Sequence, residues 1–299
     1  MLGIELLVVF VILWYIVDWC CVTARVYFSP MGFDTDHCYC LMLNRLTPNS
    51  ALYDAERTPE NDIDDLLEIA ERLRHRPGVE EVAISQNSIP YGDGSNGMTV
   101  CVDTVEINAM RRWAQPDFIR LFRIKGVAIQ DMNGKTVYTN SSDSLASVLT
   151  PNTIILSRNV TKAYEELKLP DATPLLGDQL PLWVPDNEFR MRVAGIAEPL
   201  RWSHFETSDQ WGGPFIATDF PRNVMIEFGN PAYLQLSVRV KPEADHNFVE
   251  TLMDDADRLY RIGNVYILNV LPFSELRTIE EIEDVNEVCL LYTSDAADE

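Results

Sequence analysis

The cysteines are the first residues whose type and spacing could support chemistry, as metal ligands or as a disulfide. Cys38 and Cys40 lie two residues apart, so on a strand they would point to one face and could bind a soft metal. Either could instead pair with Cys101 across a sheet in an oxidising compartment. No CxxC pair and no zinc-ligand spacing occurs. We therefore favour buried free thiols at Cys38 and Cys40.

Histidines and two polar loops are the other candidate groups. The four histidines have no ligand spacing, and we expect surface or satisfied core positions for His37, His75, His204 and His246. Residues 91–97 (YGDGSNG) lack the spaced carboxylates of a calcium loop and the following helix of a phosphate loop, so we predict a mobile hairpin connection. Residues 204–211 (HFETSDQW) form a polar and aromatic loop that could contact a substrate or partner.

Familiar catalytic motifs are missing from the sequence. It contains no G-x-x-x-x-G-K-[ST], and no G-x-S-x-G, H-E-x-x-H or G-x-G-x-x-G in a fitting context. We therefore expect no catalytic, cofactor-binding or metal-binding residue in this chain, no cofactor, and no enzyme activity. The net charge of −22 argues against a nucleic-acid partner, because phosphate backbones select basic faces. It also argues against docking on anionic lipid through a charged patch.

The elements that position these groups begin with a hydrophobic segment. Residues 6–17 (LLVVFVILWYIV) carry no charge, and the longer stretch 2–22 admits only Glu5 and Asp18. A helix of this length covers about 30 Å, enough to cross a bilayer. Aromatic residues gather toward its end, where they favour the membrane interface; they are Trp14, Tyr15 and Trp19. We predict a membrane span that continues as a helix through residues 20–28.

Other interpretations of this segment fit less well. A cleaved signal peptide would have a basic start and small residues at the cleavage site, and a lipoprotein signal would have small residues before Cys20. A buried core helix is the remaining alternative. Arg25 alone would place the following chain in the cytoplasm, but one basic residue is a weak topological signal.

The rest of the chain predicts an α+β domain with two strand–helix–strand units. The first has a strand within 37–46, a helix opened by Thr58 and Pro59 and closed by Pro77 and Gly78, a strand at 82–85 and a further strand at 98–107. The second has a half-buried alternating strand at 234–240, a helix after Asp245 and a strand at 265–271. Between them we predict helices at 116–122 and 158–167 and strands at 153–156 and 189–193.

Several short motifs occur in an order that resembles a known family. They are residues 5–18 and 27–34 (YFSPMGFD), 116–126 (PDFIRLFRIKG), 153–157 with 163–164, 176–177 and 192–199 (RVAGIAEP). This order resembles the periplasmic core domain of MacB/FtsX-type ABC transporter permeases, in a Bacteroidetes-like variant, over residues 2–288. Two positions depart from the family pattern: Arg123 replaces a glycine after Phe122, and Leu176 stands for isoleucine.

The resemblance implies a domain organisation. Residues 1–28 would be the transmembrane helix with its juxtamembrane extension. Residues 29–114 and 231–275 would form a porter-like α+β subdomain, with residues 115–230 as an inserted, mostly β subdomain. Residues 276–288 would lead into a second span absent from a truncated fragment. Residues 289–299 (CLLYTSDAADE) resemble a non-native tail, so Cys289 is not interpreted.

The resemblance also implies a function and partners. The chain would be a permease subunit in the bacterial inner membrane, with its bulk in the periplasm, coupling ATP hydrolysis to export or envelope signalling by mechanotransmission. A separate cytoplasmic ABC ATPase subunit would hydrolyse ATP. Further partners would be a second permease, membrane lipid and a periplasmic or outer-membrane protein. Alternatives are a membrane-anchored ligand-binding sensor domain, an anchored envelope enzyme and an assembly scaffold.

Overall fold

The computed structural model describes residues 2–92, 94, 96–184, 187–201, 203–210 and 213–283. Its helices are α1 (Leu2–Tyr27), α2 (Pro59–Arg74), α3 (Pro116–Leu121), α4 (Ser142–Ala146), α5 (Arg222–Phe228), α6 (Pro242–Asp245) and α7 (Phe248–Leu259). Its strands are β1 (Cys38–Arg45), β2 (Val79–Gln86), β3 (Gly97–Val102), β4 (Val105–Ala114), β5 (Gly126–Gln130), β6 (Thr136–Tyr138), β7 (Thr153–Ser157), β8 (Gln179–Val184), β9 (Asn187–Ala197), β10 (Phe215–Thr218), β11 (Gln235–Val240) and β12 (Val265–Pro272). A further helix starts at residue 273 and is described to residue 283; we call it the C-terminal helix.

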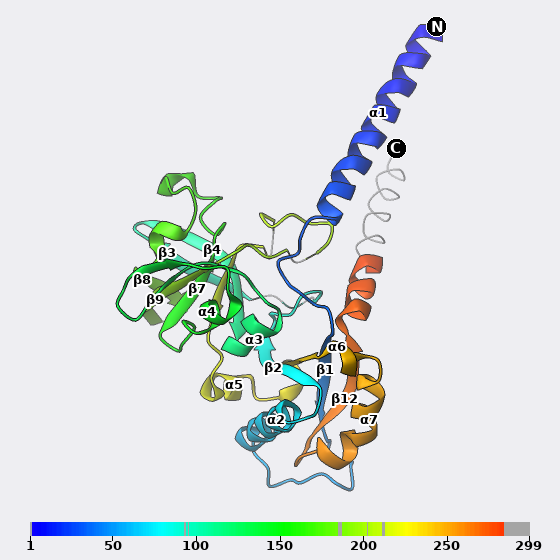
Figure 1. Ribbon diagram of the computed structural model, residues 1–299, viewed down its shortest axis with the longest axis vertical. Helices are drawn as coiled ribbons and strands as arrows, with labels where there is room; N and C mark the ends of the chain where they lie inside the picture. Colours follow the sequence, from blue (N-terminus) through cyan, green and yellow to red (C-terminus); the bar gives the residue numbers. More distant parts are fainter. Residues whose placement is uncertain are drawn as a thin grey trace.

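The first helix stands away from the rest of the molecule (Figure 1). An 18-residue window within its stretch Gly3–Tyr27 has a mean hydropathy of 2.3, and none of that window is buried, so the helix is long and apolar enough to cross a membrane. The alternative of a core helix is therefore wrong for the described chain. The predicted continuation of this helix past residue 20 is confirmed up to Tyr27.

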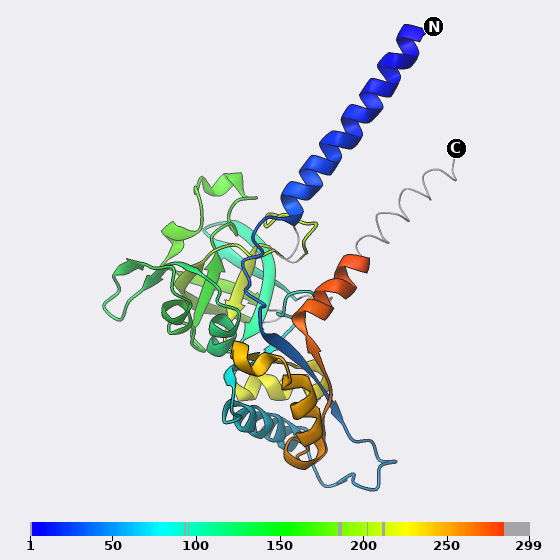
Figure 2. The same cartoon turned by 45° about the vertical axis from the view of Figure 1, so that its right-hand side comes forward.

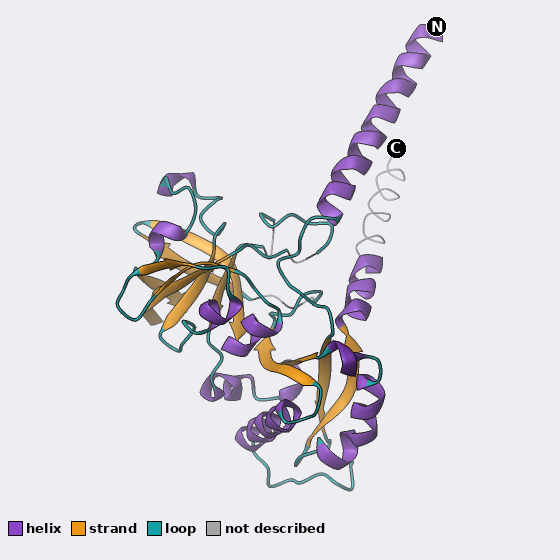
Figure 3. Cartoon of the chain, viewed as in Figure 1, coloured by secondary structure: helices purple, strands orange, loops and turns teal. Residues whose placement is uncertain are grey.

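Both predicted strand–helix–strand units meet in one antiparallel sheet, in the order β2-β11-β1-β12. The helices α2 and α7 pack on one face of these strands, as Figure 3 shows, and bury a common apolar core with them. The predicted start of α2 is confirmed by a capping box: Thr58 Oγ1 accepts a hydrogen bond from Asn61 N–H, and Asn61 Oδ1 accepts one from Thr58 N–H. Residues 38–86 and 235–272 thus give a mixed α+β architecture.

The middle of the chain forms a small closed barrel. Its strands pair around a ring in the order β4-β10-β7-β9-β8-β3, and β3 pairs with β4 to close it. A separate apolar core fills the ring, with contributions from β3 and β4 as well as from later strands. The β5–β6 hairpin attaches to β9. The limits of the two predicted subdomains stay a prediction, although β3 and β4 share the barrel core.

Three secondary-structure predictions need correction. The strand predicted at 98–107 is two strands, β3 and β4, joined by a turn in which Asp103 has a left-handed φ of 54°. The helix predicted at 158–167 is a series of turns ending in one 3₁₀ turn, Glu165–Leu167, because Asn159 Nδ2 bonds to the Ser208 carbonyl and holds the chain elsewhere. Strand β11 is buried on both faces rather than half-buried.

Predictions for the last residues fall partly outside the described chain. Residues 276–283, the beginning of the expected lead-in to a second span, are helical. The rest of that lead-in, 284–288, and the expected non-native tail, 289–299, lie outside the described residues, and so does Cys289.

Candidate functional site

The segment that joins α1 to the sheet is the point where the membrane helix meets the folded domain. We call residues 28–37 the exit segment; it runs from the end of α1 at Tyr27 to the start of β1 at Cys38. Figure 2 shows α1 and the C-terminal helix leaving the domain toward the same side. The exit segment therefore lies between the apolar helix and the sheet, and both of its ends are held by polar contacts.

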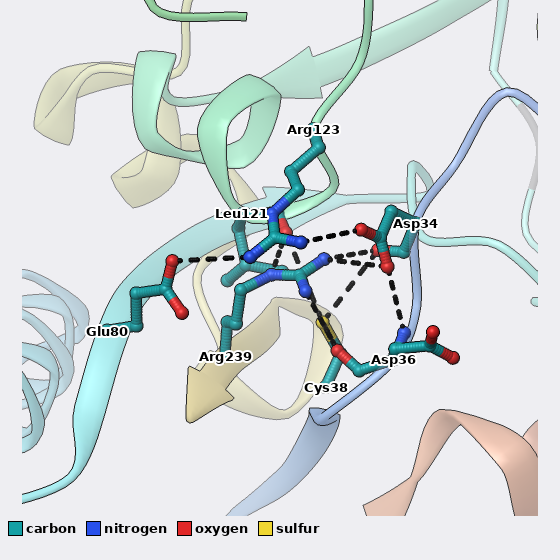
Figure 4. A network of polar contacts seen from close by, with 7 residues as sticks. All are labelled: Asp34, Asp36, Cys38, Glu80, Leu121, Arg123 and Arg239. Carbon is teal, nitrogen blue, oxygen red and sulfur yellow. Dashed lines mark hydrogen bonds and ion pairs between the residues drawn. The ribbon is translucent and has the colours of Figure 1, made fainter. Parts of the chain in front are cut away.

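A buried arginine holds the sheet end of the exit segment (Figure 4). The Arg239 side chain on β11 is only 2% exposed. Its guanidinium donates hydrogen bonds to the carbonyls of Leu121 (2.6 Å), Asp36 (2.8 Å) and Asp34 (2.5 Å). One side chain thus joins β11, the end of α3 and the exit segment, and the Cys38 thiol reaches the same three carbonyl groups.

A second arginine completes this cluster from the surface. Arg123 donates to the Asp34 carboxylate (2.9 Å) and to Glu80 (3.4 Å). Burial opposes the negative charge of Asp34 most strongly, but the nearby Arg239 and Arg123 and a hydrogen bond from Asp36 N–H leave the pKa of Asp34 lowered. Asp34 is therefore ionised at neutral pH and pairs with both arginines.

Arg123 also explains one departure from the family pattern. Its φ is +48°, in the left-handed region that glycine adopts without strain. The resemblance expects a glycine at this position, so the backbone shape is kept while the side chain changes. The strained arginine gains the ion pairs with Asp34 and Glu80 that a glycine could not make.

Apolar packing fixes the middle of the exit segment. Phe33 packs edge-on against Phe122, with ring centroids 5.6 Å apart, and Met31 is buried in the same core. Gly32 has a φ of +85°, and a Cβ there would lie 2.7 Å from the Pro199 carbonyl oxygen, so only glycine fits. This core also contains Phe273 at the start of the C-terminal helix. Both membrane-side connections therefore share one apolar core.

A polar triad joins the two helices at the membrane end. The Tyr27 hydroxyl donates to Glu281 Oε1 (2.9 Å) and accepts from Arg277 Nη2 (2.8 Å), while Arg277 Nε donates to the same carboxylate oxygen (2.6 Å). Hydrogen bonds to Glu281 and Tyr27 raise the pKa of Arg277. Burial opposes the charge of Glu281 most strongly, but hydrogen bonds from Arg277 and Tyr27 leave its pKa lowered. The contact is therefore charged at neutral pH.

A buried histidine connects this triad to the loop at 201–210. His204 is 8% exposed; its Nδ1 lies 3.2 Å from the Tyr27 carbonyl and its Nε2 lies 3.3 Å from the Tyr91 hydroxyl. The neutral ring satisfies both contacts by donating through Nδ1 and accepting through Nε2. Burial lowers the pKa of His204. Arg201 donates to the carbonyls of Ser29 and His204 and so fastens the same loop to the exit segment.

The predicted thiols lie where the sequence places them. Cys38 and Cys40 are free, buried and packed in the core beneath the exit segment, on one face of β1. Burial raises the pKa of each thiol to about 12. Cys101 lies on β3 opposite Glu106. Among the described residues, no group of three or more His, Cys, Asp or Glu side chains could hold a metal ion.

The other candidate residues are dispersed. His75 and His246 are exposed, and His37 is half-exposed beside Asp245. In the predicted connection 91–97, residues 93 and 95 lie outside the described chain, and Tyr91 is buried against His204. In the polar loop 204–211, His204 joins the membrane-end contacts and Asp209 pairs with Lys162, while Trp211 lies outside the described residues.

Sequence reasoning missed the arginines of the site. Strand alternation placed Arg239 on a solvent face, although α3 and the exit segment cover that face. The contacts of Arg277 with Tyr27 and of Arg201 with Ser29 could not be predicted, because these partners are distant in sequence. Arg123 was noticed as a departure from a glycine pattern, which was a usable sign of a left-handed backbone.

The arrangement holds the exit segment in place between the helices and the sheet. The described contacts of the exit segment are backbone carbonyls, ion pairs and aromatic packing, and they join α1, the C-terminal helix, α3 and β11.

Comparison with known proteins finds similarity among solved structures. No protein-family model matches the sequence, and no curated protein matches it. Among solved structures, a domain from Porphyromonas gingivalis that is named as a permease is similar, with 15% identity, a TM-score of 0.46, and coverage of 80% of this chain and 91% of that one. The periplasmic region of MacB from Actinobacillus actinomycetemcomitans is similar with 12% identity, a TM-score of 0.41, and coverage of 87% and 98%.

A third similar structure is the extracellular domain of the noncanonic ABC-type transporter YknZ from Gram-positive bacteria. It shares 14% identity with this chain at a TM-score of 0.38, with coverage of 77% of this chain and all of that one. The predicted MacB-like resemblance is thus confirmed, in that a MacB periplasmic region is among the similar structures. This chain is similar to extracytoplasmic domains of ABC-type transporters and permeases, at identities and TM-scores that do not assign it to their family.

Proposed function

We propose that this chain is the membrane-anchored, extracytoplasmic domain of an ABC-transporter permease. Its bulk lies outside the inner membrane and couples ATP hydrolysis to export or envelope signalling by mechanotransmission. A separate cytoplasmic ATPase subunit hydrolyses ATP, and this chain carries no catalytic residue. Residues 29–114 and 231–275 form the porter-like subdomain and residues 115–230 the inserted, mostly β subdomain, with β3 and β4 adding to the barrel core of the latter.

One observation carries the proposal. The apolar α1 and the C-terminal helix leave the folded domain on the same side and are joined there by Tyr27, Arg277 and Glu281. A domain that hangs between two membrane helices needs both connections at its membrane face. Joining them at the exit means that a movement of one helix relative to the other acts directly on the exit segment.

The contacts of the exit segment support the proposed transmission of movement from α1 to the sheet. α1 is a continuous helix to Tyr27, and only ten residues separate it from β1. The hydrogen bonds of Arg239 and the packing of Phe33 hold the segment closely against the folded domain. A helix displacement would therefore move β1 and its neighbours rather than being absorbed in a flexible linker.

The proposed partners follow from this role. The permease acts as a homodimer or with a paired permease, in contact with membrane lipid, and its outer domain meets a periplasmic or outer-membrane protein. Nucleic acid is not a partner, since the net charge is −22.

The test is to purify the full-length permease from its native membrane with its bound proteins. We expect an ATP-binding subunit to co-purify and ATPase activity to depend on the complex. The variant Arg277→Ala should leave the complex assembled but uncouple its ATPase activity from the outer domain's partner. Exposed Arg261→Ala, at the far end of the domain, serves as the control.

Two results would refute the proposal. One is a purified membrane protein without any associated ATPase. The other is an assembled complex whose activity and coupling are unchanged by Arg277→Ala.

A further inference from the structure

A cavity of about 330 Å³ lies between the sheet and the C-terminal helix. Its floor includes Cys40 of β1 and Leu271 of β12, which are paired across the two strands. The neighbouring Leu41 and Val270 belong to the core under α2 and α7, so Cys40 and Leu271 point to the opposite face of the sheet. Protein cavities that bind small molecules have volumes of about 300–1,000 Å³, and this cavity lies at the small end of that range.

The C-terminal helix forms a wall of this cavity with a face that the membrane-end triad does not use. Four of its residues have the i, i+3, i+4, i+7 spacing of one helix face and line the cavity; they are Leu276, Ile279, Glu280 and Glu283. Arg277 and Glu281, which contact Tyr27, lie more than about a quarter of a turn around the helix from that face. Ile279 is 44% exposed, so apolar surface lies open at the cavity mouth.

The charged groups at the mouth are acidic. Glu280 and Glu283 are the charged residues among the described residues that line the cavity, and no lysine, arginine or histidine is among them. Arg201 lies close enough to Glu280 to interact with its charge but does not line the cavity. The exposed Glu283 should therefore attract a ligand more strongly than Glu280 does. A cation is favoured at this mouth and an anion is disfavoured.

The inner end of the cavity offers little to a polar ligand. Gln235 Oε1 already accepts a hydrogen bond from Ser88 N–H (2.9 Å), and the Tyr91 hydroxyl lies 3.3 Å from His204 Nε2. Burial raises the pKa of the Cys40 thiol to about 12, so the thiol is uncharged at neutral pH. The interior therefore suits an apolar group rather than a charged one.

We propose that this cavity binds a small organic cation. The apolar body of the ligand enters between the sheet and Leu276, and its ammonium group stays at the mouth beside Glu283 and Glu280. A fatty acid or another anionic amphiphile would meet the same apolar walls but the wrong charge. The inference requires the folded domain alone and goes beyond the proposed permease role.

Occupancy of the cavity would act on the membrane end of the exit segment. The ligand would contact the C-terminal helix, which carries Arg277 and Glu281, and it would contact Tyr91, which stacks on His204. A ligand that binds one arrangement of these groups stabilises that arrangement. The bound cation should therefore slow local opening of the C-terminal helix.

Three probes with the same six-carbon chain separate charge from apolar packing. They are hexylammonium, hexanol and hexanoate, titrated against the full chain in phosphatidylcholine nanodiscs and followed by saturation-transfer NMR of the probe. Empty nanodiscs measure partition into the lipid, which is subtracted. We expect hexylammonium to bind about three- to fivefold more tightly than hexanol, and hexanoate to bind more weakly than hexanol. Hydrogen exchange at residues 274–283 should slow with hexylammonium.

Variants at the mouth locate the binding. Glu283→Gln should remove most of the preference for hexylammonium and leave hexanol binding as it is. Glu275→Gln removes the same charge from an exposed residue of the same helix that does not line the cavity, and it should change neither. Ile279→Trp places an indole at the mouth and should weaken the binding of all three probes.

The inference is overturned if no probe binds beyond the level of the empty nanodiscs, or if hexylammonium and hexanol bind equally. It is also overturned if Glu283→Gln weakens hexanol as much as hexylammonium, or if Glu275→Gln has the same effect as Glu283→Gln. None of these results bears on the permease role, which the co-purified ATPase tests separately.

Discussion

The two ends of the exit segment are held by different kinds of contact. At the sheet end, the buried Arg239 bonds to three backbone carbonyls, of Leu121 in the core and of Asp34 and Asp36 at partly buried positions. At the membrane end, Tyr27, Arg277 and Glu281 form a half-exposed side-chain triad, with His204 beside it. Buried bonds to backbone are costly to break, whereas half-exposed ion pairs exchange easily with water. We infer that the sheet end is a fixed attachment and the membrane end an adjustable one.

The largest expected effect is at the fixed end. Arg239→Ala should lower the free energy of unfolding by about 3–5 kcal/mol, because it removes the three hydrogen bonds of a buried guanidinium and its ion pair with Asp34. Urea denaturation of the detergent-solubilised chain measures the loss. Arg74→Ala, at a partly exposed arginine, is the matched control and should cost about 1 kcal/mol or less. Equal effects of the two variants would contradict a special role for Arg239.

A smaller effect is expected at Arg123, where backbone strain and ion pairing oppose each other. Arg123→Ala keeps the left-handed φ and loses the pairs with Asp34 and Glu80, so it should cost about 1–2 kcal/mol. Arg123→Gly loses the same pairs but relieves the strain, and it should be about 1 kcal/mol more stable than the alanine variant. If alanine is the more stable of the two, the left-handed backbone at this position is wrong.

The adjustable end should respond to pH through His204. Burial lowers its folded-state pKa, so the unfolded chain binds the proton more readily. The contribution of His204 to stability is therefore full above its ordinary value of about 6.5 and is lost as the pH falls toward the lowered folded-state value. We expect His204→Gln to reduce the drop in the urea midpoint between pH 7.5 and pH 5.

Exposed His75 provides the control for that measurement. Its ring is 76% exposed, so His204→Gln should alter the pH profile more than His75→Gln does. A His204→Gln variant with an unchanged pH profile would contradict the buried neutral ring.

The smallest effect on global stability is expected from Tyr27→Phe. The change removes one hydroxyl shared by Arg277 and Glu281 at a half-buried site, worth about 0.5–1 kcal/mol. Hydrogen exchange should show faster opening at residues 274–281, with no change in β1 or β11. Exposed Tyr138→Phe is the control, because it should alter neither region. Faster exchange throughout the sheet would contradict an adjustable, local contact.

Sequence reasoning succeeded where local chemistry decides structure. Thr58 and Pro59 mark the start of α2, and the apolar runs of β1, β7 and β12 were placed within a few residues. It failed where distant contacts decide. The residues at 158–167 have a helical pattern, but Asn159 and Tyr164 bond to Ser208 and Asn108 instead.

Most residues of the candidate site could not be predicted from the sequence for the same reason. Arg239 and Tyr27 take partners from α3, the exit segment and the C-terminal helix, up to 254 residues apart in sequence. A strand with alternating side chains predicts one solvent face, and only the assembled fold reveals that α3 covers it. The exit of the membrane helix, by contrast, was recognisable from the sequence as far as residue 28.

The central claim is that the contacts of the exit segment rearrange at its membrane end, while its contacts at the sheet end persist as the sheet moves with it. Hydrogen exchange on the full-length permease with its ATPase in nanodiscs, with and without ATP, tests it most directly. The account predicts nucleotide-dependent exchange at residues 27–33 and 274–283, with unchanged protection at residues 38–43 and 235–240. Equal change at both ends, or nucleotide-dependent change confined to the sheet, would contradict it.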